Sequence, residues 1–293
     1  MKMKGVHVAI VTPFTEDFRV DLKRLREHAE WLISEGVHGL IATGTCGEYL
    51  SLAPEERSTV VETILEAGRG RVPVTVGVAA PTTAQVVGWA EHARAHGAAA
   101  LLALPPISYR AAWREVVAHY RAIDAVGLPV FIYNNPYDTA TDITAERLLE
   151  LEELPNIAGV KEFSGDVRRV TEILAACRSE VVAGADDLVL ESLLAGATGW
   201  IAGMANIVPR ASVELYELGR NRSLDAAWKI YRRLLPLLRY DTGPTLVQAI
   251  KYGLYAIGRP VGPTRPPRLA LEAPDRERIE AALDALGVLA SRA

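Results

Sequence analysis

The chain has 293 residues, of which 49% are hydrophobic, and it carries a formal net charge of −4. This length fits one large domain or two small ones, and the apolar content is sufficient for a sizeable core. Because acidic and basic residues are interspersed, neither a nucleic acid nor an anionic membrane is an expected partner. The composition therefore favours a globular protein whose partner is a small molecule.

The two cysteines and the N-terminal segment indicate the compartment. Cys46 and Cys177 lie far apart and follow no metal-ligand spacing, so we expect no disulfide framework. No cleavable apolar segment follows residues 1–5, and no apolar run approaches the roughly 18 residues of a membrane-spanning helix. These features predict a reduced, cytoplasmic protein.

Short apolar runs alternate with amphipathic segments of helix length along the first two-thirds of the chain. Such alternation is typical of strand–helix units that form a parallel sheet. The eight predicted strands cover residues 6–11, 39–42, 72–78, 99–104, 129–133, 157–161, 180–183 and 199–202.

The first two helices have clear starting points. Leu22 and Leu25 begin a run with helical spacing behind Asp21, which is a suitable N-cap. A second helix is predicted to begin at Pro54, because proline at the first helical position sacrifices no hydrogen bond. It is predicted to run to about Ala67.

Eight strand–helix units fit either an open, doubly wound sheet or a closed (β/α)8 TIM barrel. No GxGxxG motif follows the first predicted strand, and about 250 residues are typical of a barrel, so the barrel is favoured. Residues 1–222 are predicted to form the catalytic barrel, and residues 223–293 a helical extension of the same domain. The helices of this extension are predicted near residues 224–238, 244–257 and 274–290.

Lys161 closes the sixth predicted strand and is one of only six lysines in the chain. An unpaired ammonium in apolar surroundings is costly, and proteins commonly respond by lowering the pKa of the lysine. The free amine that results is a nucleophile toward carbonyl groups. The alternative is an ion pair with Glu162 or with another acid at a strand end.

Two further polar segments follow predicted strands, at the end of a barrel where active sites lie. Residues 43–48 include glycines that permit close backbone approach, and their N–H groups and hydroxyls suit a carboxylate or phosphate. Thr45 in this loop can relay a proton, and Tyr133 at the end of the fifth predicted strand can act as general acid and base. The alternatives are a polar turn in which Glu48 begins a helix, and a core tyrosine with a satisfied hydroxyl.

The remaining candidates for chemistry are weaker. The histidines show neither HxH nor HExxH spacing, so no metal site and no cofactor is expected. Asp186 and Asp187 can ligate a cation, but starting a helix is the commoner role of such a pair. Cys46 has no histidine close in sequence, which favours packing or backbone presentation over a nucleophilic role.

Together these segments resemble the pyruvate-type class I aldolase family, which includes dihydrodipicolinate synthase and N-acetylneuraminate lyase. The matching segments are Thr12-Pro13-Phe14, Gly44-Thr45-Cys46-Gly47-Glu48 (family pattern GxxGE), Tyr133-Asn134-x-Pro136, Gly159-Val160-Lys161-Glu162 and Gly199-Trp200-Ile201. They occur in the order of the family, and the match covers nearly the whole chain.

The resemblance implies roles for individual residues. Lys161 would form a Schiff base with C2 of a 2-keto acid, Tyr133 would transfer protons, and Thr45 would hydrogen-bond that tyrosine. The residues that would surround the substrate carboxylate are Gly44, Cys46 and Gly47, with Ile201 on the opposite wall. The resemblance also implies a homotetramer, a dimer of dimers, with the C-terminal helices near the barrel mouth.

Three positions depart from the dihydrodipicolinate synthase pattern. Asp138 stands where these enzymes usually carry an arginine that binds the aldehyde's carboxylate. Ile107 stands where they carry a tyrosine that is contributed across a dimer interface, and Tyr109 is a possible replacement. Cys46 stands where Thr or Ser is more frequent, so a hydroxyl is missing from the carboxylate site.

The sequence therefore predicts a Schiff-base-forming lyase that acts on pyruvate or a hydroxylated, sugar-acid-like 2-keto acid. Asp138 would bind hydroxyl groups better than a carboxylate. One alternative is a synthase of the dihydrodipicolinate type, which condenses pyruvate with aspartate semialdehyde in lysine biosynthesis. The other is a non-catalytic barrel that binds keto acids.

Overall fold

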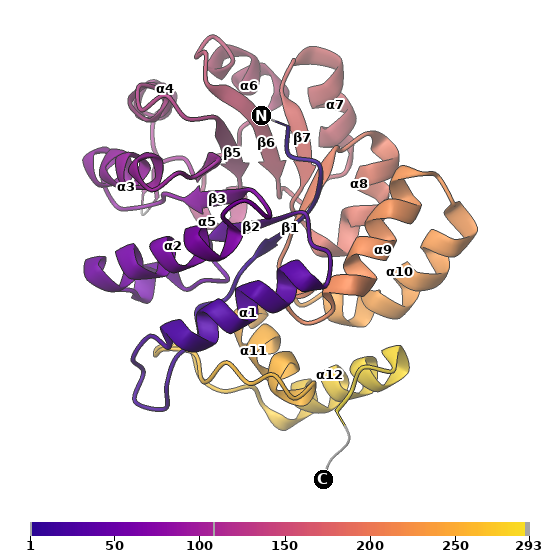
Figure 1. The fold of residues 1–293 in the computed structure, drawn as a ribbon. Helices are drawn as coiled ribbons and strands as arrows, with labels where there is room; N and C mark the ends of the chain where they lie inside the picture. The colour runs from indigo at the N-terminus through magenta and orange to yellow at the C-terminus, as the bar shows by residue number, and fades with distance from the viewer. Residues whose placement is uncertain (1, 108, 291–293) are drawn as a thin grey trace.

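The fold is a closed barrel of parallel strands surrounded by helices (Figure 1). The computed structural model describes residues 2–107 and 109–290. The strands are β1 Gly5–Ala9, β2 Gly39–Ala42, β3 Val74–Gly77, β4 Ala100–Ala103, β5 Val130–Asn134, β6 Ile157–Glu162, β7 Glu180–Ala183 and β8 Gly199–Ala202. Each strand pairs with its neighbours in chain order, and β1 also pairs with β8, which closes the ring. The predicted TIM barrel and its eight strands are confirmed.

One helix follows each strand and covers the outside of the barrel. These helices are α1 Leu22–Ser34, α2 Pro54–Gly68, α3 Thr83–Ala95, α4 Trp113–Asp124, α6 Ala145–Leu151, α7 Arg168–Ala176, α8 Val189–Ala195 and α9 Pro209–Arg220. Short helical turns lie in the loops at the carboxyl ends of the strands: η1 Tyr49–Ser51, α5 Pro136–Thr139, η2 Asp186–Leu188 and η3 Met204–Asn206. Nearly every strand residue is buried, because side chains inside the ring and helices outside it cover both faces.

The predicted helix starts are confirmed. The Asp21 carboxylate accepts a hydrogen bond from the Arg24 N–H at 2.9 Å, and this satisfies one of the free donors of α1. Pro54 begins α2, and the carboxylate of Glu56 accepts the Ala53 N–H at 2.9 Å. Local side-chain chemistry therefore sets both boundaries.

Three helices follow the barrel: α10 Leu224–Leu238, α11 Leu246–Ala256 and α12 Ala273–Leu286. α12 packs against both α10 and α11, and Figure 1 shows α11 and α12 outside the ring of strands. The last helix ends earlier than predicted because Gly287 adopts a φ of +74°, which terminates it. The buried core is continuous from the strands to Leu234 and Ile250 in these helices, while the division at residues 222 and 223 stays a prediction.

Among residues 2–107 and 109–290, no helix is both long and apolar enough to cross a membrane.

Candidate active site

Lys161 and Tyr133 lie side by side at the carboxyl ends of adjacent strands. β5 and β6 pair so that Tyr133 is opposite Lys161, and such partners project on the same side of a sheet. The Lys161 Nζ atom lies 4.0 Å from the centre of the Tyr133 ring, and both side chains are buried. The barrel therefore juxtaposes an amine and a phenol that are distant in sequence.

The space around Lys161 depends on a glycine that follows β7. A Cβ atom at Gly184 would lie 2.5 Å from the carbonyl oxygen of Glu162 and 3.0 Å from Cε of Lys161. Any side chain at this position would displace the lysine or the backbone of β6. Gly184 carries no recognisable signal in the sequence, because only the packed barrel brings these two strand ends together.

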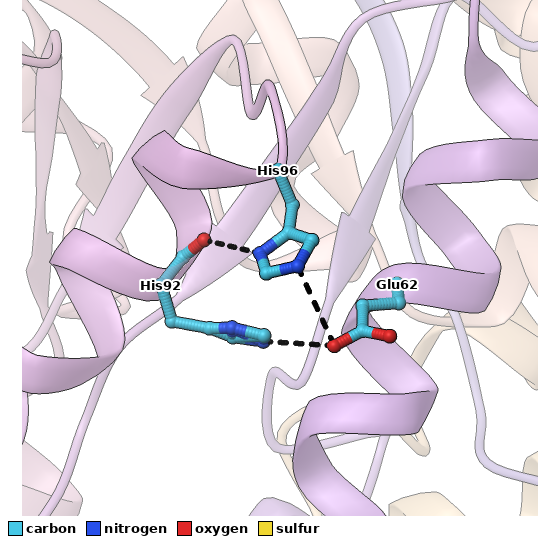
Figure 2. A group of neighbouring side chains, drawn as sticks. All are labelled: Glu62, His92 and His96. Atoms are coloured by element: carbon cyan, nitrogen blue, oxygen red, sulfur yellow. Dashed lines mark hydrogen bonds and ion pairs between the residues drawn. The ribbon is translucent and has the colours of Figure 1, made fainter.

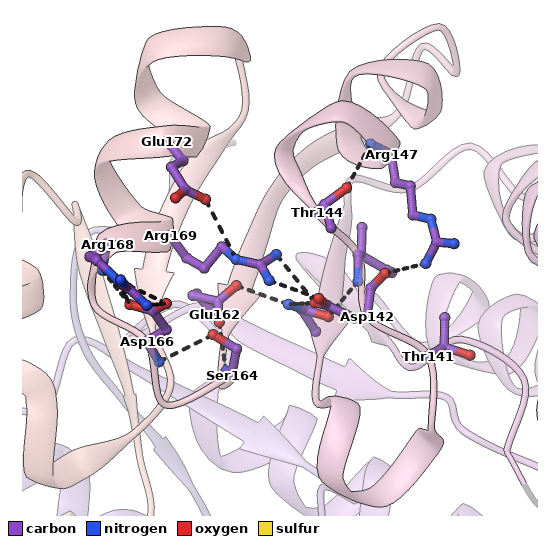
Figure 3. A network of polar contacts seen from close by, with 12 residues as sticks. Thr141, Asp142, Thr144, Arg147, Glu162, Ser164, Asp166, Arg168, Arg169 and Glu172 are labelled. Atoms are coloured by element: carbon purple, nitrogen blue, oxygen red, sulfur yellow. Dashed lines mark hydrogen bonds and ion pairs between the residues drawn. The ribbon is translucent and has the colours of Figure 1, made fainter.

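Glu162 points away from its neighbour Lys161. Its carboxylate accepts hydrogen bonds from Asn134 Nδ2 at 3.0 Å and from the Ser164 N–H at 2.5 Å. Figure 3 shows Glu162 within a network in which Arg169 binds Asp142 at 2.7 Å. Lys161 and Glu162 therefore form no ion pair, because successive residues of a strand face opposite sides.

The net direction predicted for the Lys161 pKa is wrong. Burial lowers the pKa of Lys161, but the phenolic group of Tyr133 and the carboxylate of Asp241 favour the ammonium more strongly, so the net pKa is raised. Burial raises the pKa of Tyr133, and the Lys161 ammonium opposes that rise. These neighbours therefore favour the ammonium form of Lys161, and the reactive amine forms by loss of a proton.

Asp241 is the acid that the sequence analysis missed. It lies in the loop between α10 and α11, and a Cβ atom at Gly203 would lie 2.8 Å from its Oδ1. Its Oδ2 accepts the Asp186 N–H at 3.0 Å. Burial raises the pKa of Asp241 to about 6, while the charge of Lys161 opposes this rise. No sequence pattern marks Asp241, because it precedes a Thr-Gly-Pro turn between two helices of the predicted extension.

Asp186 holds the loop that follows β8. Its carboxylate accepts hydrogen bonds from the indole N–H of Trp200 at 2.7 Å, the Gly203 N–H at 3.1 Å and the Met204 N–H at 2.7 Å. Burial, followed by the charge of Asp241, raises the pKa of Asp186 well above its usual value. The Asp186 carboxylate caps no helix of its own and instead fixes the turn η3.

Asn135, and not Thr45, approaches the hydroxyl of Tyr133. Asn135 Nδ2 lies 3.4 Å from that hydroxyl and donates to the Asp138 carboxylate at 2.8 Å. Thr45 is half-buried in the loop after β2 and lines the same cavity. Within the described part of the chain no hydrogen bond joins Thr45 to Tyr133, so the contact implied by the family resemblance is not formed in this structure.

The loop after β2 has a strained but firmly held backbone. Thr43 and Glu48 adopt φ angles of 52° and 53°, a left-handed conformation that is uncommon for residues other than glycine. The Thr43 hydroxyl donates to the Gly77 carbonyl at 2.9 Å. The Glu48 carboxylate is buried and pairs with Lys251 Nζ of α11 at 2.8 Å. Glu48 therefore ties this loop to a C-terminal helix.

A cavity of about 420 Å³ opens at this end of the barrel. Of the predicted site residues, its lining includes Gly44, Thr45, Cys46, Tyr133, Asp138, Lys161 and Ile201. Gly47 is buried in the turn and does not line the cavity. Lining residues that the sequence analysis missed include Asn135, Phe163, Gly203, Asp241 and Arg268. The barrel therefore brings together all but one of the predicted residues.

Cys46 and Tyr109 each have a simple structural explanation. Burial raises the pKa of the Cys46 thiol well above its ordinary value, which agrees with packing and disfavours a thiolate nucleophile. Tyr109 is 53% exposed, and its hydroxyl lies 3.4 Å from Glu115 instead of in the cavity. Ile107 packs against the core. The single chain therefore places no tyrosine of the loop after β4 among the cavity-lining residues that the structure describes.

Comparison with known proteins agrees with this arrangement. The sequence profile of the dihydrodipicolinate synthetase family matches residues 2–286. The chain belongs to this family. It is 35% identical over 289 residues to the 4-hydroxy-tetrahydrodipicolinate synthase of Acidiphilium cryptum, covering 98% of this chain and 99% of that protein. It is also 35% identical over 293 residues to a DapA-like lyase of Halobacterium salinarum, covering 98% of this chain and 95% of the relative.

Solved structures of the dihydrodipicolinate synthetase family have the same fold. The dihydrodipicolinate synthase from Acinetobacter baumannii, solved with pyruvate, superposes with a TM-score of 0.93 at 30% identity, covering 98% of this chain and all of that one. Family members are class I lyases that form a Schiff base on a lysine and use a small, pyruvate-type substrate. This chain is therefore a Schiff-base lyase, which sets aside the alternative of a non-catalytic barrel.

Proposed function

We propose that Lys161 forms the Schiff base with C2 of a 2-keto acid and that Tyr133 moves protons during the reaction. The observation that carries this proposal is the pairing of Tyr133 with Lys161, whose Nζ lies 4.0 Å from the ring at the wall of the cavity. A phenol next to the imine nitrogen can reach both that nitrogen and the adjacent carbon. The side-chain amide of Asn135, 3.4 Å from the phenolic oxygen, helps to orient the phenol.

The chemistry follows from the imine. The neutral amine of Lys161 attacks the carbonyl carbon, and the resulting carbinolamine loses water to give a protonated imine. This iminium accepts electrons from C3, so that a C3 proton becomes acidic or the C3–C4 bond can break. Tyr133 then takes up or returns the proton. Because the pKa of Lys161 is raised, its amine stays charged until the substrate or a water molecule accepts a proton from it.

The carboxylate of the keto acid binds to the loop after β2. Gly44 and Cys46 line the cavity there, and Ile201 lies on β8 across from them. Backbone N–H groups in such a loop suit an anion. Thr45 lies close enough to the cavity to contact the substrate, although it does not bond Tyr133 in the unliganded chain.

The rest of the substrate is a hydroxylated, sugar-acid-like chain. Asp138 stands at the exposed rim of the cavity, and Asp241 lies within it. Carboxylates accept hydrogen bonds from hydroxyl groups, and they repel a second carboxylate. This pair of acids therefore favours the aldolase and dehydratase reactions over condensation with an acidic aldehyde.

A second candidate is condensation of pyruvate with aspartate semialdehyde. Arg268 supports it, because its side chain lines the cavity and can bind the carboxylate of that aldehyde. Relatives such as the Acidiphilium cryptum protein are named 4-hydroxy-tetrahydrodipicolinate synthase. The guanidinium lies 3.6 Å from Glu48, however, so part of its charge is already neutralised.

Borohydride trapping tests the shared step. The protein is reduced in the presence of pyruvate or of each of a panel of 3-deoxy-2-keto sugar acids, digested and mapped by mass spectrometry. We expect an adduct on the peptide that contains Lys161. An adduct on another lysine, or none with any keto acid, would remove Lys161 from the mechanism.

A turnover assay then separates the two substrates. We expect faster turnover of a hydroxylated keto acid than of pyruvate with aspartate semialdehyde. The opposite ranking would establish the synthase reaction in its place and leave the Schiff base intact.

Assembly and location complete the proposal. A homotetramer in the cytoplasm is the state we expect, and the 53% exposure of Tyr109 near the mouth of the barrel supports burial of this edge by another copy.

A further inference from the structure

Two helices on the outside of the barrel bring a carboxylate and two imidazoles together, away from the catalytic cavity. Glu62 comes from α2, His92 from α3, and His96 directly follows the last residue of α3 (Figure 2). The ligand atoms of the three side chains all lie within 4.8 Å of one another. None of the three residues lines the active-site cavity.

We propose that Glu62, His92 and His96 bind a divalent transition-metal ion, with Zn²⁺ as the best match. Two imidazoles and one carboxylate are a ligand set that suits this ion. Three protein ligands leave a fourth position for water, and the side chains of Glu62 and His96 are 45% and 44% exposed, so solvent can reach it. The expected role is a clamp that joins α2 to α3.

The distances fit coordination better than hydrogen bonding. Glu62 Oε1 lies 3.5 Å from His92 Nε2 and 3.6 Å from His96 Nε2. A good N–H···O bond spans only about 2.7–3.2 Å. Ligand bonds of about 2.0–2.2 Å give a zinc tetrahedron with edges of about 3.3–3.6 Å. Both distances from Glu62 already match such edges, and all three ligand atoms lie within 4.8 Å of one another.

Both imidazoles have an Nε2 atom that is available to bind a metal ion. His96 Nδ1 lies 2.8 Å from the carbonyl oxygen of His92, and because a carbonyl only accepts, Nδ1 carries the proton. The Nε2 lone pair of His96 is then free and directed at Glu62, as Figure 2 shows. Metal-bound histidines usually donate their other N–H to a carbonyl or carboxylate in this way. The Nε2 atom of His92 is buried and has no hydrogen-bond partner, and an ion would satisfy it.

The spacing explains why the sequence analysis expected no metal site. His92 and His96 are four residues apart, which places both rings on one face of a helix, with their centres 4.2 Å apart. The glutamate comes from the preceding helix, so neither an HxH nor an HExxH motif is present. Only the packing of α3 against α2 completes the set.

Binding of Co²⁺ and Zn²⁺ to the untagged, chelator-treated protein tests this proposal. Isothermal titration should give one equivalent of Zn²⁺ per chain, and Co²⁺ should give the visible absorption of a four-coordinate site. Glu62→Gln and His96→Ala, both at half-exposed positions, should each weaken binding at least tenfold. A matched control is Glu217→Gln, because Glu217 faces His38 at 3.6 Å, without a second histidine.

Two further readouts keep the result independent of folding and of catalysis. Zn²⁺ should raise the Tm of the parent protein and of Glu217→Gln, but not that of His96→Ala, since only a bound ion stabilises the native state. Without metal, all variants should melt at similar temperatures. The proposal is overturned if Glu62→Gln binds Zn²⁺ as tightly as the parent, or if Co²⁺ shows a thiolate charge-transfer band, which would assign the ion to a cysteine, Cys46 or Cys177.

Discussion

At the scale of single residues, the reactivity of Lys161 depends on its neighbours more than on its burial. Burial lowers its pKa, as expected for an amine at a strand end, but Tyr133 and Asp241 reverse the sign. Lys161 and Tyr133 were predictable because each ends an apolar run, where barrels place their chemistry. Asp241 was not, because an acid in a turn between helices has no distinguishing pattern in sequence.

The first prediction concerns the roles of the amine and the phenol. Lys161→Ala should abolish both the borohydride adduct and turnover, because no nucleophile remains. Tyr133→Phe should still form the imine slowly but lose most turnover, by a factor of about 10²–10⁴ that is typical of proton transfer. Lys229→Ala, at an exposed position of α10, is the control and should behave as the parent. Full turnover by Tyr133→Phe would contradict a role for the phenol.

The second prediction concerns pH. Asp241→Asn removes a negative charge that favours the Lys161 ammonium, so the pKa of Lys161 should fall and more free amine should be present at a given pH. The rate of reductive trapping, measured against pH with a saturating keto acid, should therefore rise at lower pH than in the parent. Asparagine can still accept the Asp186 N–H through its carbonyl oxygen. A profile that is unchanged, or shifted to higher pH, would show that Asp241 does not act on Lys161.

At the scale of elements, the C-terminal helices complete the site. The loop between α10 and α11 supplies Asp241, and Lys251 of α11 pairs with Glu48 of the loop after β2. The sequence predicted these three helices, and the family resemblance placed them near the barrel mouth, but neither indicated which of their residues would line the cavity. Periodicity reports which face of a helix is apolar and does not report which other element covers it.

The third prediction tests this connection. Glu48→Gln should leave the Lys251 ammonium buried without its counter-ion. We therefore expect the free energy of unfolding to fall by about 3–5 kcal/mol, the typical cost of removing one partner of a buried ion pair. The double substitution Glu48→Gln with Lys251→Met should recover part of the loss, because no buried ammonium is then left without a counter-ion, while Arg268 is partly exposed to solvent. Urea unfolding of the single and double variants measures both effects.

A surface pair provides the control for that comparison. Lys23 and Glu27 lie 4.0 Å apart on α1 and are exposed, so Lys23→Ala should change stability by less than about 1 kcal/mol. A Glu48→Gln variant as stable as Lys23→Ala would show that the buried pair does not hold the loop.

At the scale of the whole molecule, the loops after β2 and β4 carry large exposed side chains. Tyr109 is exposed and its hydroxyl lies near Glu115. Leu50, at the end of the loop after β2, is 68% exposed. Large exposed side chains at the carboxyl end of the barrel favour an interface between copies of this chain.

The fourth prediction is therefore a tetramer. Light scattering during size-exclusion chromatography should give about four times the chain mass of 31.8 kDa. Tyr109→Ala should shift the distribution toward smaller species, whereas Tyr255→Ala, at an even more exposed residue of α11, should not. A monomeric parent protein would contradict the assembly.

The sequence by itself determined the barrel, its eight strands and the loops that carry the chemistry, because these depend on local periodicity and on the order of the units along the chain. It also indicated Lys161 and Tyr133. Only the tertiary structure decided the protonation of Lys161, the partner of Glu48 and the meeting of Glu62 with two histidines. Those outcomes depend on distances between side chains that are remote in sequence. Only the packing of the folded chain sets these distances, and they decide which charges interact and which side chains can share a ligand.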